Sequence, residues 1–555
     1  MPTEFQITKK RNFRTIWRKW PLLLGMLFWP TGELSSQDQP LRQRIDQGVS
    51  AKWTQENVVP AAVASDAEFL RRVYLDLVGV IPTYEETVSF LSDTSPTKRA
   101  ARIDQLLNDP RFAQQQADWW DLILFGRRPP GYETDKRDGI QRWLREQFAA
   151  NRPYDEFVRE LLRAEGNSVE QGPPMYYVQY RNQPEDLNEA VTQTFLGVQL
   201  QCARCHDHPF DSWKQVDFFG MAAFFARLEV VQVGKKDNLS MFAIGERNTG
   251  DVLFTGPAKD QQPGKKGEPI KPKFLLGETL PEPALPSDYK EVKFAANTPP
   301  PPPLNSRKDQ FAAWVANADN PYFARAIANR VWAQYMGHGI VHPVDNLSPA
   351  NKPSHPELLD ELTRWLVANK FDLRAYIREL TNSQTYQLSS FGGSGESRPV
   401  LFQHARTRPL SAEELVASWR VATGYDATVK EKDTGKAPSR FRPFEGGYVM
   451  QFFGQPNNGV GDFQGGLAEH LYLNNGPLGS VIVATPGGLL SELINTKQPL
   501  EQRVERLYLQ VLNRPPQAEE RQRFSDLITA GKDTDERWRD AIWSFITCSE
   551  FRFNH

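Results

Sequence analysis

The sequence predicts a mainly α-helical protein made of two helical lobes, joined by a Pro-rich linker and carrying at most a few short strands. Capped segments with helical hydrophobic periodicity recur in both halves of the chain. Between them, 12 prolines occur among residues 257–303 and end in the run Pro299–Pro303. We find no convincing internal repeat and no alternation of strands with helices, so a parallel α/β fold is not expected.

The first expected helix covers residues 66–80, where Ser65 can cap the start and apolar residues recur every three or four positions. Residues 98–112 and 154–166 repeat this pattern. In the second half, the helix expected over 320–337 begins at Asn320-Pro321 and ends at Gly337. Its apolar face holds Phe323, Ile327, Val331 and Tyr335. Further capped helices are expected over 354–370, 411–424 and 500–516, and short strands around 242–254 and 274–276.

The segment between the lobes is rich in Lys, Glu and Gly as well as Pro. Such a composition cannot bury enough apolar surface to order itself fully, and a five-proline run favours an extended spacer. We therefore expect domains at 40–255 and 305–555, with a linker at 256–304.

Composition excludes several classes of protein. A mass of 63.3 kDa is too large for one hydrophobic core. The formal charge of −2 shows no basic excess, so we expect no nucleic-acid partner. Three cysteines cannot build a disulfide scaffold, and no uncharged apolar run reaches the length of a membrane span, which excludes a multi-pass membrane protein.

Residues 1–36 are typical of an export signal. Six Lys or Arg residues lie among the first 20, and the uncharged, largely apolar stretch 20–32 follows them. Because no A-x-A cleavage pattern is present, a retained anchor that associates the protein with the membrane is the alternative. We expect an exported protein of the periplasm or cell envelope. An amphipathic N-terminal helix of a cytosolic protein is the competing interpretation.

One cluster, at residues 202–213, carries recognisable chemistry. It contains Cys202, Cys205, His206, Asp207, His208 and Asp211. If the helix that begins at Pro184 continues in register, Cys202, Cys205 and His206 fall on its apolar face together. Pro209 would then end the helix, and Asp211-Ser212 would cap the next one.

Cys-x-x-Cys-His is the attachment pattern of haem c, in which both thiols bind the haem vinyl groups and the histidine binds the iron. A zinc or iron site that uses Cys202, Cys205 and His206 or His208 is the first alternative. A Cys202–Cys205 disulfide without a cofactor is the second. Asp207 and Asp211 could orient the histidines or could cap helices. Met221 and Cys548 are expected in the core.

Other catalytic signatures are missing from the sequence, including G-x-S-x-G, the Walker A pattern and H-E-x-x-H. The stretch 459–466 is expected to be a flexible loop. Three functions therefore stay open: a haem-dependent redox role, a periplasmic metalloenzyme using the same cluster, or a non-catalytic envelope or scaffold module.

The stretch FLGVQLQCARCHDHPFDSWKQVDFFGMAAFFARL resembles the planctomycete-specific cytochrome-like domain, a domain of unknown function. The second lobe resembles its usual partner, another planctomycete-specific domain of unknown function, in NPYFARAIANRVWAQYMGHGIVHPVDNLSPANKPSHPELLDELTRWL, NSQTYQLSS and SEFRFNH. The resemblance covers about residues 40–255 and 305–555. It implies a bacterial, exported, two-domain protein with a haem connection at Cys202, Cys205 and His206, extended more weakly to Asp207 and His208. Many relatives also carry Cys-x-Cys-Glu-Arg before a stretch like EHLYLNNGPL, where this chain has no cysteine.

Overall fold

The computed structural model of the chain describes residues 39–126, 137–181, 183–254, 256, 267–394, 398–425, 467–476, 483–530 and 534–555. The expected signal at 1–36 and the expected loop at 459–466 lie outside these ranges. None of the helices in the described ranges combines the length and the hydropathy that crossing a bilayer requires. Residues Pro40–His555 form one unit, and Met1–Gln39 is a separate one.

The first half of the chain is helical, as its periodicity predicts. The expected cap at Ser65 is present, because its hydroxyl accepts a hydrogen bond from the Glu68 N–H at 3.2 Å. Thr83 and Glu86 form a reciprocal capping box at the next helix. The helices are α1 (Leu41–Glu56), α2 (Asp66–Val78), α3 (Tyr84–Ser92), α4 (Lys98–Leu107), α5 (Pro110–Phe125), α6 (Asp138–Ala149), α7 (Tyr154–Arg163), α8 (Pro174–Val178), α9 (Pro184–Val191) and α10 (Gln215–Ala222).

The second half is helical as well. The Asn320 side chain accepts hydrogen bonds from the N–H groups of Tyr322 and Phe323, and Gly337 ends the following helix at φ 76°, as expected. The helices are α11 (Arg307–Val315), α12 (Phe323–Met336), α13 (Pro356–Ala368), α14 (Leu373–Thr381), α15 (Ala412–Thr423), α18 (Leu467–Asn475), α19 (Leu489–Asn495), α20 (Leu500–Val511), α21 (Ala518–Thr529), α22 (Thr534–Thr547) and α23 (Ser549–Arg552).

The strands of the described ranges form three small antiparallel pairs. The longest is the hairpin of β1 (Leu228–Lys236) and β2 (Leu239–Glu246), whose register shifts between Gln232 and Gly234. The others pair β3 (Val252–Phe254) with β4 (Glu268–Ile270), and β5 (Arg408–Pro409) with β6 (Phe553–Asn554). The mainly α prediction is confirmed. The strand expected at 274–276 is absent, since only an isolated bridge joins Lys273 to Thr279.

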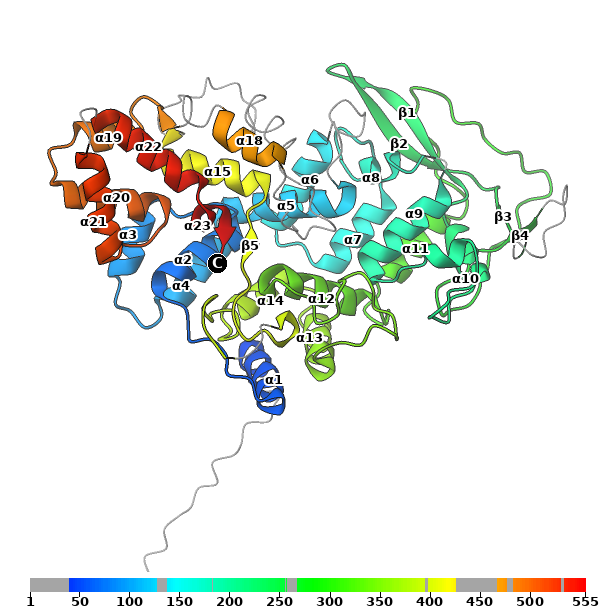
Figure 1. The fold of residues 1–555 in the computed structure, drawn as a ribbon. Coiled ribbons are helices and arrows are strands. Elements are labelled where there is room, and N and C mark those ends of the chain that lie inside the picture. The colour runs from blue at the N-terminus through cyan, green and yellow to red at the C-terminus, as the bar shows by residue number, and fades with distance from the viewer. Residues whose placement is uncertain are drawn as a thin grey trace, which may run out of the picture. The chain divides into compact units, whose positions relative to one another are not determined.

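Two apolar cores each combine residues from both halves of the chain. In the larger core, Trp120 packs on Tyr154, which stacks on Phe323 of α12 at a ring distance of 5.0 Å. In the smaller core, Leu75 and Ile81 pack among side chains from Leu410 onward. Figure 1 shows α3, from the first half, beside α20, from the second.

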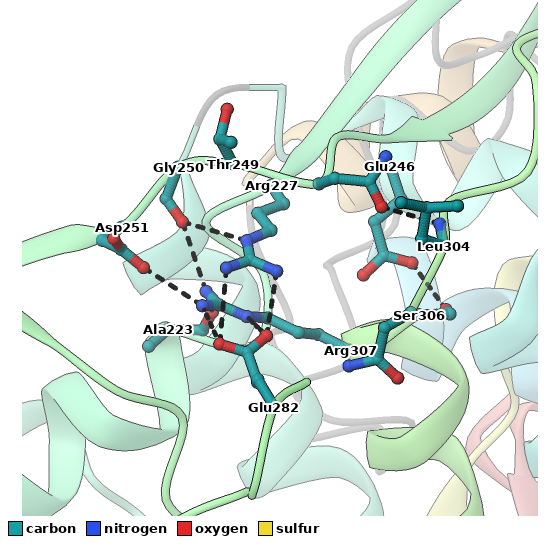
Figure 2. Close-up of polar contacts among 12 residues, drawn as sticks. Ala223, Arg227, Glu246, Thr249, Gly250, Asp251, Glu282, Leu304, Ser306 and Arg307 are labelled. Carbon is teal, nitrogen blue, oxygen red and sulfur yellow. Dashed lines mark hydrogen bonds and ion pairs between the residues drawn. The ribbon is translucent and has the colours of Figure 1, made fainter. Parts of the chain in front are cut away.

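The described part of the Pro-rich segment, residues 267–304, packs against its neighbours, and we call it the strap. Leu275 and Leu280 are buried, and the Phe294 ring lies so close to β2 that a Cβ on Gly245 would approach it to 2.4 Å. Glu282 accepts hydrogen bonds from both Arg227 and the fully buried Arg307 (Figure 2). Over these residues, polar anchors therefore add to a small number of buried apolar side chains.

Candidate functional site

The segment that leads to the cysteines is not one continuous helix. α9 ends at Val191, and the five residues Thr192–Leu196 form a π-helical turn. Gly197 then adopts φ 65°, in the left-handed region that glycine enters most readily. The expected helical register from Pro184 to His206 is therefore wrong, and Cys202, Cys205 and His206 do not share the apolar face of α9.

The cysteines lie instead on a separate helical turn, Cys202–His206, which we call the CXXCH turn. The Cys202 carbonyl accepts hydrogen bonds from the N–H groups of Cys205 and His206, both at 3.3 Å. Both thiols are free, and the two cysteines and His206 are exposed. Ala203 is buried beneath the turn. The turn thus presents two thiols and an imidazole to solvent.

Arg204 fastens this turn to α9. Its guanidinium lies 2.7 Å from the Asp186 carboxylate and 3.3 Å from that of Glu189. The side-chain amide of Gln215, at the start of α10, also donates to the Arg204 carbonyl at 3.2 Å. Arg204 is itself partly exposed, so these ion pairs contribute orientation more than stability.

His206 and Asp207 have distinct roles in the loop. His206 Nδ1 lies 2.8 Å from the Asp207 carbonyl, which accepts a hydrogen bond when Nδ1 carries the proton and leaves Nε2 free to bind a ligand. The Asp207 carboxylate accepts from the Gln215 N–H at 3.0 Å, at the first residue of α10. Of the two roles expected for Asp207, the helix-capping one is observed.

His208 and Asp211 fold the corner that follows. His208 Nδ1 accepts hydrogen bonds from the Phe210 and Asp211 N–H groups at 3.3 and 2.9 Å. The backbone N–H of His208 donates a hydrogen bond to the Trp213 carbonyl at 2.8 Å. The Asp211 carboxylate lies 3.9 Å from His208 Nδ1 and does not cap α10, contrary to expectation, because α10 starts four residues later, at Gln215. Phe210 is 82% exposed at the corner.

Two kinds of group could use these donors, a metal ion and a haem. No three His, Cys, Asp or Glu side chains within the described ranges are grouped in a way that could bind a metal ion. A site built from Cys202, Cys205, His206 and His208 is therefore not preformed, and His208 Nδ1 is already engaged. The two thiols and the following imidazole on one exposed turn do fit the donor set of haem c, which needs no convergence of four ligands.

Met221 and Cys548 both pack against apolar cores, as expected, and three histidines of the second half have defined surroundings. Met221 is fully buried in the larger core, and Cys548 packs against the smaller one, where burial raises the pKa of its thiol. His338 and His342 stack on each other with ring centroids 4.2 Å apart. His355 is buried, and burial lowers its pKa to about 4.

The structure reveals a second polar cluster that the sequence interpretation missed. Asp76 of α2 is buried and accepts hydrogen bonds from Tyr386 at 2.8 Å, Arg408 at 3.0 Å and Asn554 at 2.7 Å. Burial raises the pKa of Asp76, and Arg408 partly offsets this. Charged residues within an apolar helix, Arg71, Arg72 and Asp76, were the available signal. The adjoining cavity of about 20 Å³ accommodates no more than about one water molecule.

Two family models match the chain, in the expected order. The model PSCyt2, described as "Protein of unknown function (DUF1549)", matches residues 44–230, which include the CXXCH turn. The model PSD1, described as "Protein of unknown function (DUF1553)", matches residues 307–445. No curated protein and no solved structure matches the chain. The chain therefore contains a PSCyt2 domain of unknown function followed by a PSD1 domain of unknown function.

Proposed function

We propose that the CXXCH turn is the attachment site of a c-type haem in an exported protein with a redox role. Support comes from the exposure of Cys202, Cys205 and His206 on a single turn, which is hydrogen-bonded through the Cys202 carbonyl. Buried thiols on a continuous helix would have been inaccessible to a group of that size. The exposure of both thiols and the imidazole on one turn is the observation that carries the proposal.

Each residue of the turn has a defined part in the attachment. In such an attachment each thiol would add across one vinyl group, with an S–C bond formed and the thiol hydrogen passed to the neighbouring vinyl carbon, so no oxidant would be consumed. His206 would hold the iron through Nε2, because its Nδ1 contacts the Asp207 carbonyl and fixes the ring. A bound haem supplies one-electron chemistry at this place.

His206 is the protein ligand that we assign to the iron. Met221 is fully buried in the larger core and cannot reach a group on the exposed turn without unpacking. A haem held in this way would supply electron transfer, ligand binding or catalysis.

Export follows from the same proposal, because haem c is attached outside the cytoplasm. We assign the protein to the periplasm or cell envelope, with residues 1–36 as a cleaved signal or as a retained membrane anchor.

The test is to export the full chain from a host with a cytochrome c maturation system. We expect a Soret band and a mass gain of one haem. Cys202→Ala and Cys205→Ala should each remove one thioether and lower the haem content. Cys548→Ala is the matched control, since it removes the third cysteine of the sequence from a site elsewhere in the fold and should leave attachment unchanged.

Two other outcomes would replace the proposal. A colourless protein that holds stoichiometric zinc or iron, lost in Cys202→Ala, would identify the metalloenzyme alternative. A colourless protein of otherwise unmodified mass, in which thiol titration finds Cys202 and Cys205 oxidised to each other, would identify a scaffold module with a structural disulfide.

A further inference from the structure

The loop between α12 and α13 contacts the chain on both sides of the CXXCH turn. This loop belongs to the part matched by the PSD1 model, whereas the turn belongs to the part matched by PSCyt2. Residues 345–348 carry the contacts, and we call them the clamp.

The contacts before the turn centre on Asp345, which is 1% exposed. Its carboxylate accepts hydrogen bonds from the side-chain amides of Gln193, in the π-helical turn, and Gln199, the latter at 3.2 Å. Gln193 in turn accepts a hydrogen bond from the Gln201 side chain at 3.1 Å, at the residue that precedes Cys202. A buried carboxylate therefore fixes the approach to the cysteines.

Backbone contacts reinforce this approach. The Leu347 N–H donates to the Gly197 carbonyl at 2.7 Å, at the point where the left-handed glycine breaks the helix. A Cβ on Gly197 would lie 3.0 Å from the Leu347 side chain and 3.4 Å from Ala326 of α12, so the two segments meet at close packing distance. Arg330 of α12 also donates to the Thr194 carbonyl at 3.3 Å.

The contact after the turn is made by Ser348. Its hydroxyl donates to the Asp211 carboxylate at 2.8 Å, and the Asp211 N–H donates to His208 Nδ1 at 2.9 Å. Trp213 then packs edge-on against Tyr322, at a ring distance of 6.3 Å. The exposed turn is thus held from both ends, although its own thiols and imidazole make no contact with the clamp in the hydrogen bonds described.

We propose that Asp345 and Ser348 are positioning residues for the CXXCH turn, so that the second domain sets the geometry of a site whose binding groups belong to the first. This inference rests on the proposed function, because it assumes that the CXXCH turn is the binding site. The inference explains why Asp345 is buried although its side chain is not one of the groups that would bind the haem. It also gives the second domain a role for which that domain needs no bound ligand.

The experiment compares Ser348→Ala, Ser348→Thr and Asp345→Asn in the full chain by hydrogen–deuterium exchange, on protein without haem. Loss of a hydrogen bond to a carboxylate should raise exchange about tenfold at the amides of residues 205–211 in Ser348→Ala. The hydroxyl of Ser348→Thr should restore the wild-type rate. Ser354→Ala is the matched control, because it removes a hydroxyl from the same inter-helix loop that donates to Ile340 instead of to the site.

The outcomes separate positioning from general stability. Faster exchange confined to residues 192–213, reversed by threonine, supports the clamp. Unchanged exchange there in both Ser348→Ala and Asp345→Asn, or a uniform rise across α2, α12 and the turn that threonine does not reverse, would overturn it. Because the protein measured carries no haem, the clamp can fail while attachment succeeds, and attachment can fail while the clamp holds.

Discussion

Asn554, the penultimate residue of the chain, donates a hydrogen bond of 2.7 Å to the buried carboxylate of Asp76 on α2. The contact joins the C-terminal residues to α2. Beside it, β6 pairs with β5, and Arg72 donates to the Tyr386 and Leu388 carbonyls. The C-terminal residues therefore complete a buried polar cluster that links α2 to the second half of the chain.

Asn554→Ala should destabilise the protein by about 1–3 kcal/mol, because the buried Asp76 carboxylate loses a hydrogen-bond donor. Urea unfolding measures the change. Asn108→Ala is the control, since its exposed side chain bonds only to the Asp104 carbonyl one turn away. Equal free energies of unfolding for Asn554→Ala and the wild type would show that Tyr386 and Arg408 suffice for Asp76.

Sequence reasoning reached the helices because their signals are local. Ser65, Asn320 and Gly337 act within one turn of their own position, and each occupies the place that its residue type predicts. The partners of Asp76 lie between 310 and 478 positions away, and no local rule identifies them. The charged residue in an apolar helix could have been flagged, but its role required the tertiary fold.

The CXXCH turn also combines a feature that local sequence predicts with one that depends on tertiary contacts. The motif itself is visible in the sequence, whereas the break at Gly197 depends on the contact with Leu347 and on a π-helical turn that has no sequence signature. Helical periodicity extrapolated through a glycine gave the wrong face. The strap differs from the expected extended spacer for another reason. Ion pairs anchor it, and hydrophobic composition does not predict ion pairs.

Glu282→Gln should loosen the strap and destabilise the protein by about 3 kcal/mol. Arg307 is 1% exposed and pairs with the carboxylates of Glu282 and Asp251, so removal of the Glu282 charge leaves a buried cation with Asp251 as its remaining counter-charge among the described ion pairs (Figure 2). Thermal unfolding measures the loss, and exchange of residues 267–304 localises it.

Glu278→Gln serves as the comparison for this prediction, because Glu278 lies in the same strap and is exposed. It should remain within about 0.5 kcal/mol of the wild type. A similar small effect for Glu282→Gln would mean that Asp251 and the carbonyls balance the Arg307 charge without help.

His355 should make stability depend on pH below neutrality. Burial lowers its pKa from 6.5 to about 4, so the unfolded chain binds the proton more tightly than the folded one. The unfolded state holds more protons between those two values, and stability therefore falls as pH decreases through that window. The full loss is about 3 kcal/mol, reached near pH 4.

The measurement is urea unfolding of wild type and His355→Leu at several values of pH between 4 and 8. The difference between the two proteins isolates His355 from the other histidines and carboxylates. The wild type should lose stability more steeply on acidification than the variant does. His206→Gln, an exposed comparison, should follow the wild type, and parallel curves for all three proteins would contradict a neutral, buried His355.

His206 and His208 should respond differently to removal, because they serve different purposes in the loop. His206→Ala takes away Nε2 while both thiols remain, so exported protein should keep haem by mass but show a shifted Soret band. His208→Ala removes the acceptor of the Phe210 and Asp211 N–H groups, so it should speed exchange at residues 208–211 and leave the position of the Soret band unchanged. The opposite pattern, with the spectrum altered by His208→Ala and not by His206→Ala, would make His208 the ligand and would require the corner to refold around it.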